Sequence, residues 1–116
     1  MTEQREYLDY VEDVLDAIEK VAQFTEGMGF EQFVEDEKTA FAVIRALEII
    51  GEAVRKIPLS VRNRYAAIPW REMAGMRDKL IHDYFGVNLA VVWKTVTTDL
   101  PALEPEMRRI LAEAQR

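Results

Sequence analysis

Apolar positions recur every three to four residues along most of the chain, which is the spacing of amphipathic helices. The first such run spans residues 7–22 and ends before the glycines Gly27 and Gly29. The second run follows Asp36 and is stopped near Pro58. The pattern therefore predicts two long helices, which we expect to pack against each other in antiparallel fashion.

Shorter helical segments make up most of the remaining chain. A helix is predicted to start at Pro69 and to run to about Phe85, with Gly86 as its C-terminal stop. No segment shows the period-two alternation of a strand. The sequence predicts one all-α domain over residues 1–116, an up-and-down bundle of about five to six helices. The other short helices are expected at residues 30–34, 59–67, 89–100 and 101–114, the last as a separate helix or as a continuation of the one before it.

Composition narrows the class of protein. Apolar residues make up 49% of the 116 positions, so a core can form without covalent links, and the absence of cysteine excludes disulfides, thiolate metal sites and cysteine nucleophiles. No apolar run approaches the roughly 20 residues that span a bilayer. The N-terminus is acidic and lacks the apolar segment of a signal peptide. We therefore expect a soluble, cytoplasmic protein that does not associate with membranes.

Charge is distributed unevenly. The net charge of −6 argues against a general nucleic-acid binder, because lysine and arginine provide most of the affinity for phosphate. Residues 1–44 carry three basic and twelve acidic side chains, residues 45–79 eight and four, and residues 80–116 four and five. The basic middle segment is compatible with an anionic ligand, and chance segregation of charge explains it equally well.

The stretch RDKLIHDY holds the only histidine, His82. At about 100° per residue, with Met73 at zero, Arg77 falls near +40° and Tyr84 near +20°, both inside the apolar arc of the helix. His82 falls near 180° and Asp78 near 140°, on the opposite side. Asp78 can contact His82 four residues later, which would raise the histidine pKa. A buried guanidinium needs a carboxylate, a ligand or a partner surface.

Arg77 and His82 therefore do not converge on one side of an ideal helix. Both can serve one site only where this helix end meets another surface, which a two-fold dimer supplies. Metal-free RNA cleavage by the 2′-hydroxyl needs a base and an acid, and the chain has one histidine. If RNA is the substrate, the chemistry requires a homodimer, which also brings two arginines to the phosphate.

Each of these residues also has a purely structural interpretation. His82 could cap a helix C-terminus through the helix dipole. Arg77 could pair with Glu48 or Glu52 of the second long helix, and Tyr84 could belong to the core. No metal site is predicted, because one histidine and scattered carboxylates lack ligand spacing. No glycine-rich phosphate loop is present either.

The block PWREMAGMRDKLIHDYFGVN, residues 69–88, closely resembles the signature of the HepT-like branch of the HEPN superfamily. That branch carries an arginine, four residues, a histidine, one residue and a tyrosine, followed by Phe-Gly-Val. The stretches EIIGEA and VWKTVTTDLPAL also resemble the helices before and after this block in the family. The resemblance covers essentially the whole chain.

The resemblance implies a HEPN-type helical bundle that acts as the toxin of a two-component toxin–antitoxin system, a metal-independent endoribonuclease without a cofactor. Such toxins form homodimers in which both copies of the motif meet in a cleft, and a minimal nucleotidyltransferase antitoxin transfers AMP to the motif tyrosine. By this resemblance Arg77 would hold the scissile phosphate and His82 would act as general base or acid. Asp78 would orient His82 or contact RNA, and Tyr84 would be the modified residue. The substrate could be transfer RNA or messenger RNA.

Two other functions remain open from the sequence. The chain could be a non-catalytic helical module whose motif helix binds the nucleotidyltransferase. It could also be a nucleotide-binding subunit, for which saturable binding of ATP or AMP without turnover would be the sign. In that case Arg77 and a basic segment would hold an adenine nucleotide, the segment being formed by Arg55, Lys56, Arg62 and Arg64.

Overall fold

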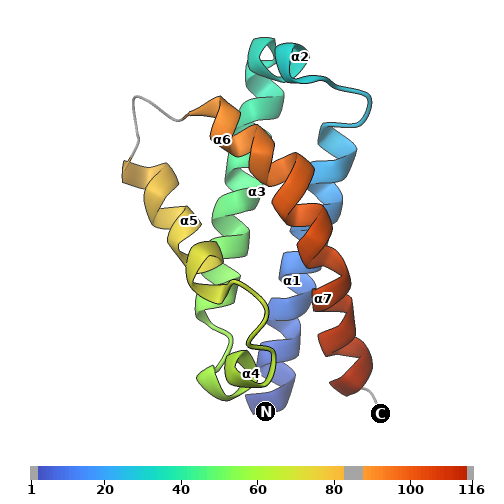
Figure 1. Cartoon of the computed structure of the whole chain (residues 1–116), viewed down its shortest axis with the longest axis vertical. Coiled ribbons are helices and arrows are strands. Elements are labelled where there is room, and N and C mark those ends of the chain that lie inside the picture. Colours follow the sequence, from blue (N-terminus) through green and yellow to red (C-terminus); the bar gives the residue numbers. More distant parts are fainter. Residues whose placement is uncertain (1–2, 83–87, 115–116) are drawn as a thin grey trace.

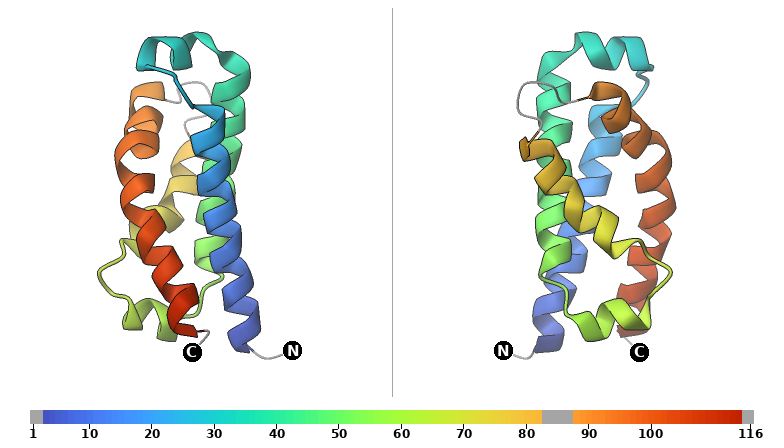
Figure 2. Two further views of the ribbon diagram at one scale, coloured as in Figure 1. Left: turned by 90° about the vertical axis from the view of Figure 1, so that its right-hand side faces the viewer. Right: turned by 60° about the vertical axis from the view of Figure 1, so that its left-hand side comes forward.

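The computed structural model describes residues 3–82 and 88–114, and side chains within residues 7–76 and 88–114. This part of the chain contains helices and turns and no strand, which confirms the predicted all-α class. The two long predicted helices are α1 (Glu3–Phe24) and α3 (Glu37–Arg55). They lie side by side and antiparallel and form the frame of the bundle (Figures 1 and 2).

The ends of the long helices follow from local hydrogen bonding. After α1 the chain turns at Gly27, whose φ of 75° is a left-handed conformation that glycine adopts without strain. Asp36 caps α3, because its carboxylate accepts hydrogen bonds from the backbone N–H and the hydroxyl of Thr39, at 3.0 and 2.8 Å. Both helix boundaries lie close to the positions predicted from the sequence.

The described parts of the shorter helices agree with the predicted pattern with one difference, and the predicted helix end near Phe85 and Gly86 lies outside the described residues. The helix expected at residues 59–67 ends at Arg64, because Tyr65 leaves the helical conformation with a φ of −117° and a ψ of 51°. The helices other than the two long ones are α2 (Phe30–Glu35), α4 (Leu59–Arg64), α5 (Trp70–His82), α6 (Leu89–Lys94), the π-helical segment η1 (Thr95–Asp99) and α7 (Leu100–Ala114).

The last three elements form one continuous helical rod, so the predicted helix at residues 101–114 is a continuation of the one before it. Pro101 cannot donate a backbone hydrogen bond to Thr97, and its ring disfavours a regular α-helical turn at this point. The rod widens immediately before it, and the backbone N–H of Leu100 bonds to the carbonyl of Thr95, five residues earlier. This local widening keeps the rod continuous.

The hydrophobic core lies between α1, α3 and the α6–α7 rod, and α5 packs mainly on α3. Both chain termini lie at the end of the bundle where α4 sits (Figure 1). Within the described residues, no helix has the length and apolarity needed to cross a membrane. The largest fully buried side chains are Val11, Val14, Val21, Phe33, Val43, Leu47, Ile50, Val54, Ile57, Met107 and Ile110.

Candidate active site

The motif predicted from the sequence lies at the C-terminal end of α5. The backbone of Arg77, Asp78 and His82 is helical, as expected, whereas their side chains lie outside the described residues. Tyr84 lies outside the described residues altogether. The roles assigned to these four residues therefore stay predictions, and the described part of the chain defines the surroundings in which they would act.

Trp70 fixes the start of α5. This residue is 7% exposed, and its indole N–H donates to the carbonyls of Arg62 and Tyr65, at 3.1 and 3.0 Å. A buried indole N–H without an acceptor would be costly, so these two carbonyls determine where the helix begins. The Pro69 carbonyl accepts the first helical bond, from Met73. The motif helix is thus attached to α4 and the following turn.

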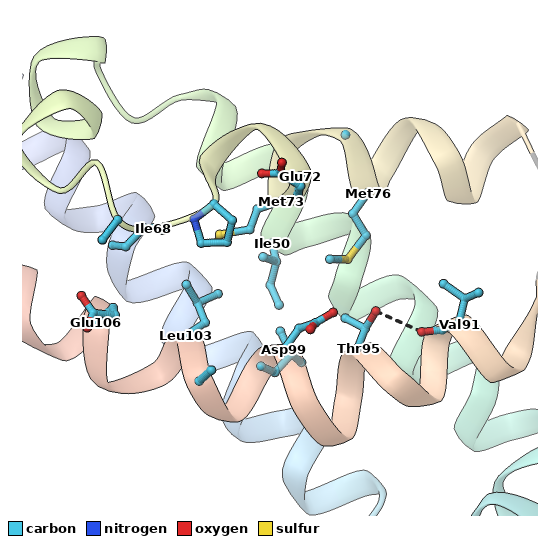
Figure 3. Close-up of a pocket in the computed structure, with 15 residues that line it drawn as sticks. Ile50, Ile68, Glu72, Met73, Met76, Val91, Thr95, Asp99, Leu103 and Glu106 are labelled. Atoms are coloured by element: carbon cyan, nitrogen blue, oxygen red, sulfur yellow. Dashed lines mark hydrogen bonds between the residues drawn. The ribbon is translucent and has the colours of Figure 1, made fainter.

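The two described members of the predicted apolar arc of α5, Met73 and Met76, face the bundle, as predicted. Met73 is 4% exposed and Met76 is half-buried, and both line a groove of about 670 Å³ between α5 and the η1–α7 rod. Figure 3 shows the two methionines on one side, Thr95, Asp99 and Leu103 on the other, and Ile50 of α3 between them.

Carboxylates surround this groove. Glu72 comes from α5, Asp99 from η1 and Glu106 from α7, and none of the fifteen described lining residues is basic. Glu106 lies 3.2 Å from the guanidinium of Arg109, although the geometry is not that of a hydrogen bond. The Thr95 hydroxyl donates to the carbonyl of Val91. An apolar floor with an acidic rim disfavours phosphate, so the groove is a poor place for RNA.

The described part of the chain offers few further sites. No group of three His, Cys, Asp or Glu side chains with described positions could hold a metal ion. The predicted basic segment is largely engaged in the fold: Arg62 donates to the carbonyls of Val54, Arg55 and Ile57, at 2.9 to 3.2 Å, and so caps the end of α3. The Lys56 ammonium lies 5.5 Å from the centre of the Tyr10 ring.

The cation of Arg55 also takes part in the fold, because its Nε donates to the Ala74 carbonyl of α5 at 3.3 Å. The alternative of an adenine nucleotide held by this basic segment therefore gains no support. In the same region, Glu48 pairs with Arg45 at 3.5 Å. The pairing of Arg77 with Glu48 or Glu52 remains a structural alternative to its catalytic role.

Sequence reasoning missed the contacts that hold α7 next to the turn before α5. The Tyr65 hydroxyl donates to Glu113, and burial together with this hydrogen bond raises the pKa of Tyr65. The Arg109 guanidinium lies 5.3 Å from the centre of the same ring. Glu113 and Arg109 lie 48 and 44 positions after Tyr65 in the chain, so the helical periodicity of the sequence could not indicate that they meet.

Comparison with known proteins gives a consistent family assignment. Residues 14–110 match the family model described as "Ribonuclease HepT-like". A protein of Thermococcus cleftensis named "Probable ribonuclease HepT" is 53% identical over 107 residues, which is 92% of this chain and 97% of that protein. No solved structure shows a significant match.

Two further relatives carry the name "Putative RNase". One, MJ1216 of Methanocaldococcus jannaschii, is 40% identical over 97% of this chain and 93% of its own length. The other, TTE0752 of Caldanaerobacter subterraneus, is 45% identical over 88% of this chain and 91% of its own length. Since the family model covers most of the chain, and the relatives match it nearly end to end, the chain belongs to the HepT-like ribonuclease family and is a ribonuclease of the HEPN type.

Proposed function

We propose that this ribonuclease is the toxin of a toxin–antitoxin pair and that it cuts RNA internally, without a metal ion, in a cleft between two copies of the chain. Membership of the HepT-like family, together with the Arg77–His82–Tyr84 pattern in the sequence, is the observation that carries the proposal. A minimal nucleotidyltransferase would silence the toxin by transferring AMP to Tyr84.

The proposed chemistry is an internal transfer at phosphorus. The 2′-hydroxyl of the RNA attacks the adjacent phosphate as His82 of one copy removes its proton. The bond to the 5′-oxygen breaks, and this oxygen takes a proton from His82 of the other copy, leaving a 2′,3′-cyclic phosphate and a free 5′-hydroxyl. The Arg77 guanidinium stabilises the charge that develops on the phosphate oxygens.

The geometry of α5 supports the need for two copies. Arg77 and His82 are five residues apart, which separates them by about 140° around the helix axis. Both backbone positions lie within α5, and on an ideal helix this separation would send the two side chains to different sides. A two-fold axis near this helix end would let one copy's arginine and the other copy's histidine act on one phosphate.

A test of the nuclease uses purified protein in excess EDTA. We expect the wild type to cleave RNA, and we expect His82→Ala and Arg77→Ala to lower the rate at least about 100-fold, the usual worth of a positioned acid–base group or charge stabiliser. Circular dichroism and sedimentation should show both variants folded and in the same assembly as the wild type. Cleavage that stops in EDTA, or that persists in His82→Ala, would contradict the proposal.

A second test addresses silencing. Incubation with ATP and a purified minimal nucleotidyltransferase should add one AMP to the wild type, as the Tyr84 hydroxyl attacks the α-phosphate and pyrophosphate leaves. Intact-mass measurement should find no such addition on Tyr84→Phe, and this variant should stay active in the same mixture. Addition of AMP to Tyr84→Phe would show that another residue is the acceptor.

A further inference from the structure

The outer side of α3 carries a row of charged side chains with one exposed aromatic ring. With the buried Ile50 at zero, these residues fall within about 80° of arc on the opposite side of the helix, at about 100° per residue. Phe41 is 66% exposed, although a phenylalanine on a solvent-facing helix surface gains nothing from water. We call this row the α3 stripe; it consists of Phe41, Arg45, Glu48, Glu52 and Arg55.

Charge along the α3 stripe is self-complementary. Arg45 and Glu52 are seven residues apart, about 10.5 Å along the axis, and both are exposed. A two-fold axis perpendicular to α3 and midway between them sets Arg45 of each copy opposite Glu52 of the other. The pair then occurs twice in one contact, as in any isologous interface. Among the described residues Glu52 has no ion-pair partner within its own chain.

We propose that the α3 stripe is the surface on which a second copy of the chain packs, with the two α3 helices antiparallel about this axis. The inference rests on the dimer of the proposed function and specifies its interface. Glu48 of each copy then lies close to the axis, where its negative charge is offset by Arg45 of its own chain at 3.5 Å.

The positions of the exposed apolar side chains agree with this antiparallel alignment of the two α3 helices. Phe41 and Leu59, which are 66% and 69% exposed, are the two most exposed of the large apolar side chains with described positions. They lie beyond opposite ends of the Arg45–Glu52 segment. Antiparallel packing brings Phe41 of one copy level with Lys56 of the other and close to the level of Leu59, so both lose exposed apolar surface.

The motif helix borders this stripe. Arg55, at the end of the α3 stripe, reaches the Ala74 carbonyl of α5. The two helices run in opposite directions, and Figure 1 shows that α5 slants away from α3 toward its C-terminal end. Because Arg55 contacts Ala74 and the helices run in opposite directions, residues 77–82 lie toward the level of residues 47–52 along α3, and these α3 residues flank the proposed axis. The interface would bring both copies of the motif to the same level, and the site is incomplete without the second copy.

Charge reversal tests this register. Arg45→Glu and Glu52→Arg each place like charges opposite each other twice per dimer, and we expect each to raise the dimer dissociation constant at least about tenfold. An equimolar mixture of the two variants forms heterodimers in which both facing pairs again have opposite charge. Sedimentation equilibrium on the mixture should recover the wild-type dissociation constant to within about threefold. RNA cleavage in EDTA should recover with it.

A matched control is Lys20→Glu, which makes the same charge change at an exposed position of α1. The Lys20 side chain is 55% exposed and that of Arg45 65% exposed. We expect the control to dimerise and cleave like the wild type. Circular dichroism should show that all three variants are folded, since each changes a solvent-facing side chain.

The outcomes separate this inference from the proposed function. If the mixture dimerises no better than the single variants, or if the single variants dimerise like the wild type, the α3 stripe is not the interface, and cleavage by the wild type would still support the nuclease. A restored heterodimer with a wild type that does not cut RNA would support the interface and contradict the nuclease. A wild type that cuts RNA as a monomer would contradict the dimer itself.

Discussion

The motif helix α5 and the C-terminal helix α7 flank the same pair of long helices, and they are held in different ways. The α7 helix buries a side chain at every third or fourth position along its length, namely Leu100, Leu103, Met107 and Ile110. The described part of α5 buries only Trp70 and Met73, both in its first turn. Among the side chains with described positions, those that fix α5 therefore lie at its start, whereas those that fix α7 are spread along most of that helix.

Polar contacts show the same contrast. Side chains tie α7 to two other elements: Arg108 pairs with Glu19 of α1 at 3.0 Å, and Glu113 accepts from Tyr65. The described part of α5 is tied by the indole of Trp70 and by the Arg55 bond to the Ala74 carbonyl. The described polar contacts of α5 thus join its first half to α3 and to the segment before it.

The largest effect on the difference between α5 and α7 should come from replacing Trp70, which fixes the start of α5. We expect Trp70→Ala to lower the free energy of unfolding by about 3–5 kcal/mol, because it removes a large buried ring and leaves two carbonyls without their donor. Urea denaturation followed by circular dichroism would measure the loss. Hydrogen exchange should show that the amides of α5 lose protection before those of α7.

Two variants sharpen that result. Trp70→Phe keeps most of the apolar volume and removes only the N–H, so its loss should be nearer about 1–3 kcal/mol. Met107→Ala opens a cavity under α7 and should cost about 2–5 kcal/mol, with protection lost in the bundle as a whole. Equal loss of protection in α5 and α7 for Trp70→Phe would mean that the two helices are anchored alike.

The fold could be predicted because helical periodicity is a local property of the chain. Asp36, Pro58 and Pro69 mark the boundaries of α3 and α5 through their own backbone preferences, which act in any context. The position of Arg77 and His82 near the end of α5 followed from the same spacing. Met73 and Met76 were predicted to lie on the apolar side of α5, and this is confirmed because both line the groove.

Contacts between distant residues could not be predicted in this way. Arg62 was a candidate ligand-binding cation in the sequence, and it caps α3, since the chain turns back at Pro58 and brings it to the orphan carbonyls. The self-complementary charges of the α3 stripe are visible in the sequence only after the structure shows which side of α3 its neighbours leave exposed. The acidic groove likewise combines residues from three separate segments, namely α3, the start of α5 with the turn before it, and the α6–α7 rod.

A smaller effect is expected at the contact that holds α7. Tyr65→Phe removes the hydrogen bond to Glu113 and should lower the free energy of unfolding by about 1 kcal/mol at neutral pH. Because burial and this bond raise the pKa of Tyr65 in the folded state, its stabilising contribution is present below the unfolded pKa of about 10 and is lost as the pH rises further.

Unfolding curves at pH values from neutral to above about 10 would test the sign of this dependence. The gap between the wild type and Tyr65→Phe should narrow as the tyrosine ionises. A gap that widens with rising pH would mean that the folded protein favours the ionised tyrosine, which the buried position and the facing carboxylate of Glu113 argue against.

The smallest effect should follow from filling the groove between the two helices. Ala102 is exposed and lines this groove, so Ala102→Trp places a ring in it without removing any buried side chain. If RNA approaches from the α3 side of α5, cleavage should stay within about twofold of the wild type, as for a substitution that touches neither substrate nor core. Asp99→Asn is the matched control, because it keeps the groove open and removes one carboxylate charge at its rim.

A loss of about tenfold or more in the cleavage rate of Ala102→Trp, with unchanged stability and dimerisation, would place the substrate path between α5 and α7. The acidic rim would then have to act on something other than phosphate, because carboxylates from three elements repel an anion whichever copy of the chain supplies the histidine.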